Sequence, residues 1–242
     1  MKYAIISDIH SNLEAFKTVL KKIENLAVDQ IICLGDIVGY GPSPNECVEI
    51  VRENNITCIL GNHDRAACGM IDPVYFNPIA KQAVLWTRKN ISQDNSQFLR
   101  NLPTTIEYDN FLVLHGAISD PDKYLINISD TEEEFPLLAD QKIGFFGHTH
   151  IQTYFTYLGG VITQSKNSEA VVKDRAKYLI NPGSVGQPRD RDPRASLLVY
   201  EVDGDKKRLT YKRVDYDIGA TQKKIFEADL NPSLAQRLSY GY

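Results

Sequence analysis

The five histidines of the chain are the residues whose positions point most directly to chemistry. They are His10, His63, His115, His148 and His150. Each follows a short apolar run that is typical of a β-strand, and oxygen-bearing side chains stand close to several of them, namely Asp8, Asp36, Asn62 and Asp64. Ligands of open α/β sheets bind where parallel strands end. We therefore interpret these residues as parts of one site.

The donor set of this site predicts two metal ions. Imidazole nitrogens with carboxylate and amide oxygens, and no thiolate, suit borderline divalent ions. Seven side chains are candidate ligands: Asp8, His10, Asp36, Asn62, His115, His148 and His150. Two ions about 3.5 to 4 Å apart that share one carboxylate would use them all. Because residues i and i+2 of an extended segment point to the same side, we expect Asp8 to act with His10 and His148 with His150.

The first sixty residues alternate between apolar strands and helices. We expect strands over 2–7, 30–34 and 56–60, and helices over 12–26 and from Ser43 to about Asn54. The first helix opens with Ser11 and Glu14 in the spacing of a capping box. Strands separated by single helices predict a parallel sheet that is covered on both faces.

The remainder of the chain changes character twice. Residues 66–101 read as a helical insertion, with Trp86 in a core position. Strands over 104–108, 111–115 and 142–146, a helix over 130–139 and further β segments to 214 come before a helical tail over 217–242. We expect that tail to pack on the molecule's own sheet. No linker composition interrupts the sequence, so we expect residues 1–242 to form a single domain.

Composition excludes several classes of protein. The 242 residues include 27 lysines and arginines against 31 acidic residues, a net charge of −4, whereas general nucleic-acid binding draws on a basic excess. No apolar run approaches the roughly 20 residues of a membrane span. The four cysteines form no Cys-x-x-Cys pair, so we expect free thiols and a cytoplasmic location.

Five ordered motifs resemble the calcineurin-like metallophosphoesterase family. They are Asp-x-His at 8–10, Gly-Asp-x-x-Gly at 35–39, Gly-Asn-His-Asp at 61–64, the isolated His115 and Gly-His-Thr-His at 147–150. The segment Asn-Pro-Gly-Ser-Val-Gly at 181–186 resembles the small bacterial and archaeal phosphodiesterase branch. The resemblance implies an α/β fold, a four-layer α/β/β/α sandwich of two mixed β-sheets flanked by helices.

The same resemblance implies a role for each site residue. Asp8, His10 and His150 would hold one divalent metal, Asn62, His115 and His148 the other, and Asp36 would bridge them. Manganese is the first choice, with iron, zinc, nickel, cobalt or magnesium as alternatives. A metal-bridging hydroxide would attack phosphorus. His63 would protonate the leaving oxygen, and Asp64 would accept a hydrogen bond from the other ring nitrogen of His63.

Departures from the family pattern narrow the substrate. Serine/threonine phosphatases carry phosphate-gripping arginines where this chain has Tyr40-Gly41 and Leu60. Symmetrically cleaving dinucleoside tetraphosphatases share the first of those arginines. We therefore expect a phosphodiesterase that acts on a small phosphodiester or a nucleotide. An asymmetric dinucleoside polyphosphate hydrolase, a phosphomonoesterase and a non-catalytic protein-binding platform are the alternatives, and retention of His63 and all seven ligand positions favours an enzyme.

Three further residues are candidates for substrate contact. Arg189 or Arg65 could grip phosphate, and Tyr40 could stack on a nucleobase. The simpler interpretations are an ion pair of Arg189 with Asp190 or Asp192, and plain packing of Tyr40. The oligomeric state does not follow from the sequence.

Overall fold

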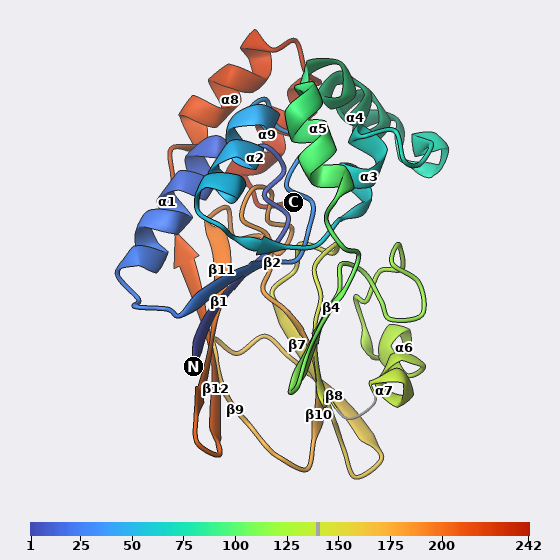
Figure 1. The fold of residues 1–242 in the computed structure, drawn as a ribbon, viewed down its shortest axis with the longest axis vertical. Helices are drawn as coiled ribbons and strands as arrows, with labels where there is room; N and C mark the ends of the chain where they lie inside the picture. Colours follow the sequence, from blue (N-terminus) through green and yellow to red (C-terminus); the bar gives the residue numbers. More distant parts are fainter. Residues whose placement is uncertain (139–140) are drawn as a thin grey trace.

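Two six-stranded mixed sheets face each other in the computed structural model, which describes residues 1–138 and 141–242 (Figure 1). The first sheet has the order β3-β2-β1-β11-β12-β9. Its strands are β1 (Lys2–Ile6), β2 (Gln30–Cys33), β3 (Thr57–Cys58), β9 (Glu169–Val172), β11 (Ala195–Asp203) and β12 (Lys206–Val214). Strands β1, β2 and β3 pair in parallel, as expected, and β11 then adds antiparallel to β1.

The second sheet has the order β4-β5-β6-β10-β7-β8. Its strands are β4 (Ile106–Tyr108), β5 (Phe111–Val113), β6 (Ile143–Phe145), β7 (Thr153–Leu158), β8 (Val161–Ser165) and β10 (Lys177–Asn181). Strands β5, β6 and β10 are parallel, so both sheets have a parallel part whose carboxyl ends can carry a site.

Burial on both faces of β1 explains the layering. Ala4 and Ile6 pack against α1 (Leu13–Glu24) and α2 (Pro44–Glu53), whereas Tyr3 and Ile5 pack against the second sheet. The outer face of the second sheet is covered by α6 (Ile128–Thr131) and α7 (Glu134–Leu137). The fold is therefore the expected four-layer α/β/β/α sandwich. Helices cover one face of the first sheet, and the second sheet covers its other face.

The other helices gather at one end of the two sheets (Figure 1). They are α3 (Asn62–Ala67), the 3-10 turn η1 (Pro73–Tyr75), α4 (Pro78–Asn90), α5 (Gln93–Arg100), α8 (Ile218–Glu227), α9 (Pro232–Gln236) and the 3-10 turn η2 (Arg237–Ser239). The helical region thus begins at Asn62, inside the Gly-Asn-His-Asp motif. No helix in the described ranges is long and apolar enough to cross a membrane.

Two expectations about helices are corrected. The helix expected over 130–139 is two short helices, α6 and α7, because Pro136 is tolerated only in a first turn, which it occupies in α7; Ala139, the expected end, lies outside the described residues. The C-terminal tail does not pack on a sheet. Leu234 and Leu238 are buried with Tyr40 and the α4 face, and Trp86 packs against this cluster, as expected of a core residue.

Candidate active site

The seven candidate ligands come together at the carboxyl ends of the parallel strands. Asp8 and His10 follow β1, Asp36 follows β2, Asn62 begins α3 after β3, His115 follows β5, and His148 and His150 follow β6. Six of them form two buried groups of three. Within each group the ligand atoms lie within 4.8 Å of one another; one group is Asp8, His10 and His150, and the other is Asp36, His115 and His148. The structure therefore brings together the residues that the ends of the strands indicated.

The backbone of these loops is not extended, which corrects the expected geometry. Asp8 and His10 have φ values of 54° and 50°, and His148 and His150 have values of 65° and 60°. Left-handed backbone costs a residue with a side chain roughly 1–2 kcal/mol. The ligand pairs therefore converge through left-handed turns rather than through the side-chain alternation of a strand.

Hydrogen bonds between loops hold these strained turns. Asp8 N donates to Gly35 O at 3.0 Å, and His10 N donates to Asp36 O at 2.9 Å. The 181–186 segment contributes from the other side, because Gly186 N and Ser184 Oγ donate to Asp8 O at 3.0 and 2.8 Å. Strain of this kind persists where the surroundings fix the conformation, and it gathers at functional sites.

The orientation of His10 and His150 fits a bound cation. The Nδ1 atoms pair with the carbonyls of Val38 and Gln187 at 3.1 and 2.6 Å, so each Nδ1 carries the proton. Each neutral ring then has a bare Nε2, and these two acceptors face each other at 3.0 Å. Two lone pairs aimed at one point need a cation, and a backbone partner on the other ring nitrogen is typical of metal-binding histidines.

The second group uses the opposite nitrogen in one of its two histidines. His115 Nδ1 donates to Leu34 O at 2.8 Å, which leaves Nε2 beside Asn62 Oδ1 at 3.2 Å. His148 Nε2 pairs with Asp122 O at 3.1 Å, which leaves Nδ1 as the free ligand atom. The donors therefore fit a second divalent ion.

Asp36 lies between the two groups. Its Oδ2 is 3.6 Å from His10 Nε2 and 3.3 Å from His115 Nε2, while Oδ1 accepts a hydrogen bond from His63 N at 2.9 Å. Burial raises the pKa of Asp36. The charges of His115, His63 and His10 outweigh burial and hold that pKa well below its usual range. Burial lowers the pKa of His115, and Asp36 reverses this effect and raises it to about 10. Asp36 is therefore an anion in contact with both groups.

Asp8 is the second buried carboxylate of the centre. Its Oδ1 lies 3.4 Å from His150 Nε2, and burial raises its pKa to about 7. Two carboxylates and four imidazoles are thus enclosed with their ligand atoms turned inward. This donor set fits two divalent metals.

His63 is buried beside this centre, and its expected partner is elsewhere. Asp64 Oδ1 accepts from Val38 N at 2.9 Å and Oδ2 accepts from Gly61 N at 3.1 Å. His63 Nδ1 has no hydrogen-bond partner among the described residues. The expected His63–Asp64 hydrogen bond is therefore wrong: the Asp64 side chain turns back to the start of α3 and fixes the loops there. Burial lowers the pKa of His63 to about 4, against the opposing effect of Asp36.

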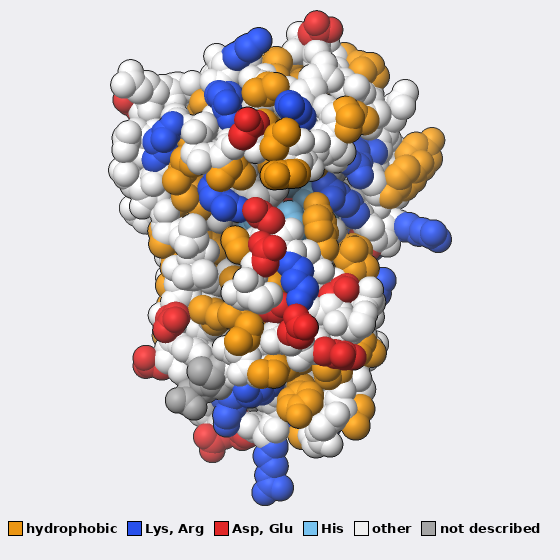
Figure 2. Space-filling model, turned by 90° about the vertical axis from the view of Figure 1, so that its right-hand side faces the viewer, with side chains coloured by type: hydrophobic (Ala, Val, Ile, Leu, Met, Phe, Trp, Pro, Cys, Tyr) orange, Lys and Arg blue, Asp and Glu red, His pale blue; other side chains and the backbone are white. Residues whose placement is uncertain are grey.

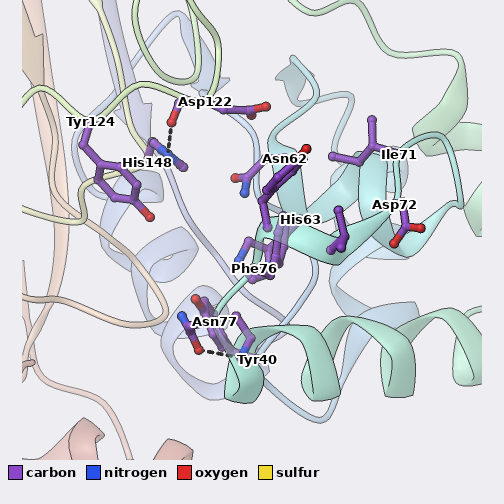
Figure 3. Close-up of a pocket in the computed structure, with 13 residues that line it drawn as sticks. Tyr40, Asn62, His63, Ile71, Asp72, Phe76, Asn77, Asp122, Tyr124 and His148 are labelled. Atoms are coloured by element: carbon purple, nitrogen blue, oxygen red, sulfur yellow. Dashed lines mark hydrogen bonds between the residues drawn. The ribbon is translucent and has the colours of Figure 1, made fainter.

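A pocket of about 560 Å³ opens over His63, Asn62 and His148 (Figure 3). Its far wall comes from residues 71–77 of the helical region, and Asp122 and Tyr124 complete it. The space-filling view shows histidine at the bottom of a hollow rimmed by hydrophobic and charged side chains (Figure 2). A small ester can therefore reach the centre from solvent.

Comparison with known proteins decides the family. The profile described as the calcineurin-like phosphoesterase superfamily domain matches residues 1–205. The chain belongs to this superfamily. It is accordingly a metal-dependent phosphoester hydrolase, and the expected family and class of activity are confirmed.

Individual relatives of this phosphoesterase fall into two groups. The crystal structure of a metallophosphoesterase from Sphaerobacter thermophilus is 40% identical, with 100% of both chains covered and a TM-score of 0.87. Protein MJ0912 of Methanocaldococcus jannaschii is 38% identical over 98% of this chain and 97% of its own length. A symmetrical bis(5'-nucleosyl)-tetraphosphatase from Actinobacillus pleuropneumoniae is 29% identical over 48% of this chain and 44% of its own length.

The two arginines proposed for this phosphoesterase differ in their surroundings. Arg65 forms an ion pair with Asp122 at the pocket rim, so its charge is already balanced. Arg189 instead donates to Tyr40 Oη at 3.3 Å and to Gln187 Oε1 at 3.0 Å, both neutral oxygens.

The expected ion pair of Arg189 with Asp190 or Asp192 is wrong. Asp190 pairs with Arg213, and Asp192 pairs with Arg194 and Arg213. Among residues 1–138 and 141–242, Arg189 therefore has no ion-pair partner.

Aromatic rings surround the centre, and sequence reasoning found only one of them. Tyr40 is buried against His10 and His63, with ring centroids 4.7 and 4.4 Å apart. Tyr124 lies over His148 at 4.0 Å, and Phe76 lies 4.9 Å from His63. Tyr124 and Phe76 stand outside every motif, and Asp122 orients His148 through its backbone carbonyl, so neither residue type nor spacing marked these three positions.

Proposed function

We propose that the protein is a binuclear-metal phosphodiesterase that hydrolyses a small phosphodiester or a nucleotide. The observation that supports this most is the pair of buried ligand groups joined at Asp36, with His63 beside them and a pocket above. When bound, two divalent ions would act as Lewis acids on phosphoryl oxygens and lower the pKa of a water molecule. Manganese is the metal we propose to test first.

Asp8, His10 and His150 are proposed to hold one ion, and Asn62, His115 and His148 the other, with Asp36 shared. The 3.3 to 3.6 Å separations of Asp36 from histidines of both groups support the shared role. The carbonyl partners of the four histidines fix each ring before any ion binds, which limits the reorganisation needed on binding.

His63 is proposed to donate the proton to the leaving oxygen. Its ring lines the pocket, lies between Tyr40 and Phe76, and takes no part in either ligand group. Burial favours the neutral ring, whereas the negative charge of a bound phosphate ester favours the protonated ring. Substrate binding would therefore charge the acid that the reaction needs.

A diester suits the shape of the surroundings. The main pocket meets a second hollow at Tyr40 and Asn77, so two groups attached to one phosphorus could extend in different directions. The apolar wall at 71–76 would receive the larger group. Asymmetric hydrolysis of a dinucleoside polyphosphate is the second candidate, favoured by Arg189, whose hydrogen bonds go to the neutral oxygens of Tyr40 and Gln187.

We also propose that residues 1–242 act as one domain. Segment 71–77 and the C-terminal tail, far apart in the sequence, both border the centre through Tyr40. All four cysteines are buried free thiols, which supports our proposal of a cytoplasmic location.

The test is to strip the purified protein of metal, reload it with manganese and compare three substrates. These are bis-nitrophenyl phosphate, mononitrophenyl phosphate and a dinucleoside tetraphosphate. Metal-dependent cleavage of the diester is the expected result. A strong preference for the dinucleotide would favour the second candidate, preference for the monoester would indicate a phosphomonoesterase, and inactivity with both metals bound would contradict the enzymatic proposal.

His63→Ala separates the acid role from metal binding. We expect both ions to remain and turnover of alkyl esters to fall by about 10² to 10⁴, with a smaller loss for nitrophenyl leaving groups, which need no proton. The exposed α4 residue Gln82, changed to alanine, is the control. An equal loss on alkyl and nitrophenyl esters would remove His63 from this role.

A further inference from the structure

The ring of His63 has no hydrogen bond at Nδ1 among residues 1–138 and 141–242, although this atom is buried. Asp64, the expected partner, bonds to Val38 N and Gly61 N instead. A Cβ atom on Gly39 would lie 2.5 Å from His63 Nδ1, so the backbone of Gly39 closes this side of the ring. A catalytic imidazole is ordinarily oriented by a hydrogen bond at the nitrogen that does not react. Other contacts must therefore set the direction of Nε2.

Three aromatic rings surround His63 in place of a hydrogen-bond partner. Its ring centroid lies 4.4 Å from that of Tyr40, 4.8 Å from that of His10 and 4.9 Å from that of Phe76. Aromatic rings at such separations have preferred mutual orientations. His10 is fixed by its own hydrogen bond to Val38 O, and the Tyr40 ring is buried against both histidines. Phe76 is the ring of the three that comes from the helical insertion.

The backbone on both sides of Phe76 is fixed. Phe76 N donates to Pro73 O at 3.1 Å and ends the turn η1, while Asn77 Oδ1 accepts from Ala80 N at 3.0 Å and caps α4. Tyr75, the preceding residue, is 97% exposed, whereas Phe76 is partly buried against the core. Figure 3 shows Phe76 beside His63 at the wall of the pocket. The turn therefore presents one ring to His63 from a firm base.

We propose that Phe76 is a positioning residue for His63. Together with Tyr40 it holds the imidazole so that Nε2 points at the leaving oxygen. This inference rests on the proposed function, in which His63 donates the proton, and it assigns the helical insertion a part in the reaction. No bond is made or broken at Phe76, which acts only through the ring of His63.

The kinetic test compares Phe76→Leu with the wild-type protein, both loaded with manganese, on ethyl phenyl phosphate and ethyl nitrophenyl phosphate. These diesters are similar in size, but phenol is the weaker acid and depends more on a donated proton. For the phenyl ester we expect kcat to fall by about 10- to 100-fold, since misplacing a group by about 1 Å costs up to about 10²-fold. KM should change little, and the nitrophenyl ester should lose much less.

Two control variants accompany this comparison. Phe76→Tyr keeps the ring and should retain the kcat of the wild-type protein on both esters. Phe226→Leu makes the same change at an exposed position of α8 and should have no effect. Equal losses on the phenyl and nitrophenyl esters in Phe76→Leu would overturn the positioning role.

A double variant separates positioning from direct contact of Phe76 with the substrate. Changes at residues that act as a unit are not additive. In a His63→Ala background, Phe76→Leu should therefore cause no further loss on the phenyl ester. A full additional loss would show that Phe76 acts on the substrate itself and would overturn the proposal.

A spectroscopic measurement tests the positioning without turnover. NMR of zinc-loaded protein, which is diamagnetic, gives nuclear Overhauser contacts between the His63 ring protons and Gly39, assigned by their absence in His63→Ala. We expect Phe76→Leu to weaken these contacts, and Phe76→Tyr and Phe226→Leu to preserve them. Unchanged contacts in Phe76→Leu would overturn the proposal. If the wild-type protein hydrolyses none of the esters, the proposed function fails, and these spectra still decide whether Phe76 orients the ring.

Discussion

Gly61→Ala tests whether Asp36 is held where both metals need it. A Cβ atom on Gly61 would lie 2.0 Å from Asp36 Oδ1 and 2.4 Å from Asp36 N. Ordinary contact begins at 3.4 Å, so the methyl group and the carboxylate oxygen must separate by 1.4 Å. Gly61 has φ −92° and ψ 175°, which alanine adopts freely. The collision is therefore the main effect of the substitution.

A shift of that size should disturb both ions together. Misplacing a reacting group by about 1 Å can cost about 10²-fold in rate, and loss of supporting contacts weakens metal affinity by about 10- to 100-fold. We expect both effects in Gly61→Ala, because moving Asp36 Oδ1 also breaks its hydrogen bond with His63 N.

The assay combines metal counting by mass spectrometry, manganese titration and hydrolysis of bis-nitrophenyl phosphate. Gly219→Ala, within α8, is the matched control, since only Asp217 Oδ1, at 3.5 Å, lies near its new methyl group. Asp36→Asn keeps the shape but removes the charge, and it should weaken both ions even if Gly61→Ala folds poorly. If the Gly61→Ala and Asp36→Asn variants bind two ions at wild-type affinity and hydrolyse the diester at a rate within twofold of wild type, the shared role of Asp36 is refuted.

Two further predictions concern stability. Manganese at 100 times its dissociation constant should raise the free energy of unfolding of stripped protein by about 2.7 kcal/mol, or Tm by about 5–11 °C, and calorimetry showing no shift would contradict a metal site in the folded state. Glu134 is fully buried and accepts from Lys123 and from the backbone and hydroxyl of Ser119, so Glu134→Gln should cost about 2 kcal/mol. Burial raises the pKa of Glu134, but these partners outweigh it and lower the pKa, so its contribution is present above the unfolded pKa of about 4.3 and is lost as pH falls through the folded pKa. Denaturation of the wild-type protein and Glu134→Gln at pH 7 and pH 3 measures this contribution to the free energy of unfolding. A similar loss of stability in Glu133→Gln, at an exposed position, would contradict the prediction.

The ends of strands were predictable because burial leaves a direct mark in the sequence. Strands β1, β2 and β6 are short apolar runs, and the rule that ligands gather at their carboxyl ends brought Asp8, Asp36 and His148 into one site. The layers followed from the family resemblance rather than from the pattern, since a strand buried by helices and one buried by a second sheet have the same apolar sequence.

What could not be predicted depends on loops meeting other loops. The Asp64 carboxylate was expected at His63, but it bonds to Val38 N and Gly61 N because α3 begins at Asn62 and turns it back. No local pattern records such encounters, because the partners are distant in sequence and use backbone atoms.

The glycines of the motifs let neighbouring loops approach the ligand turns closely. A Cβ atom on Gly186 would lie 1.9 Å from Ile9 O, and one on Gly147 would lie 2.0 Å from Ser7 Oγ. Both contacts flank Asp8, whose left-handed backbone is held by Gly186 N. Gly186 therefore supports the candidate ligand Asp8, because its missing side chain lets the 181–186 segment close on the β1 loop. Strained turns such as that of Asp8 survive only where neighbouring backbones can approach closely enough to hold them.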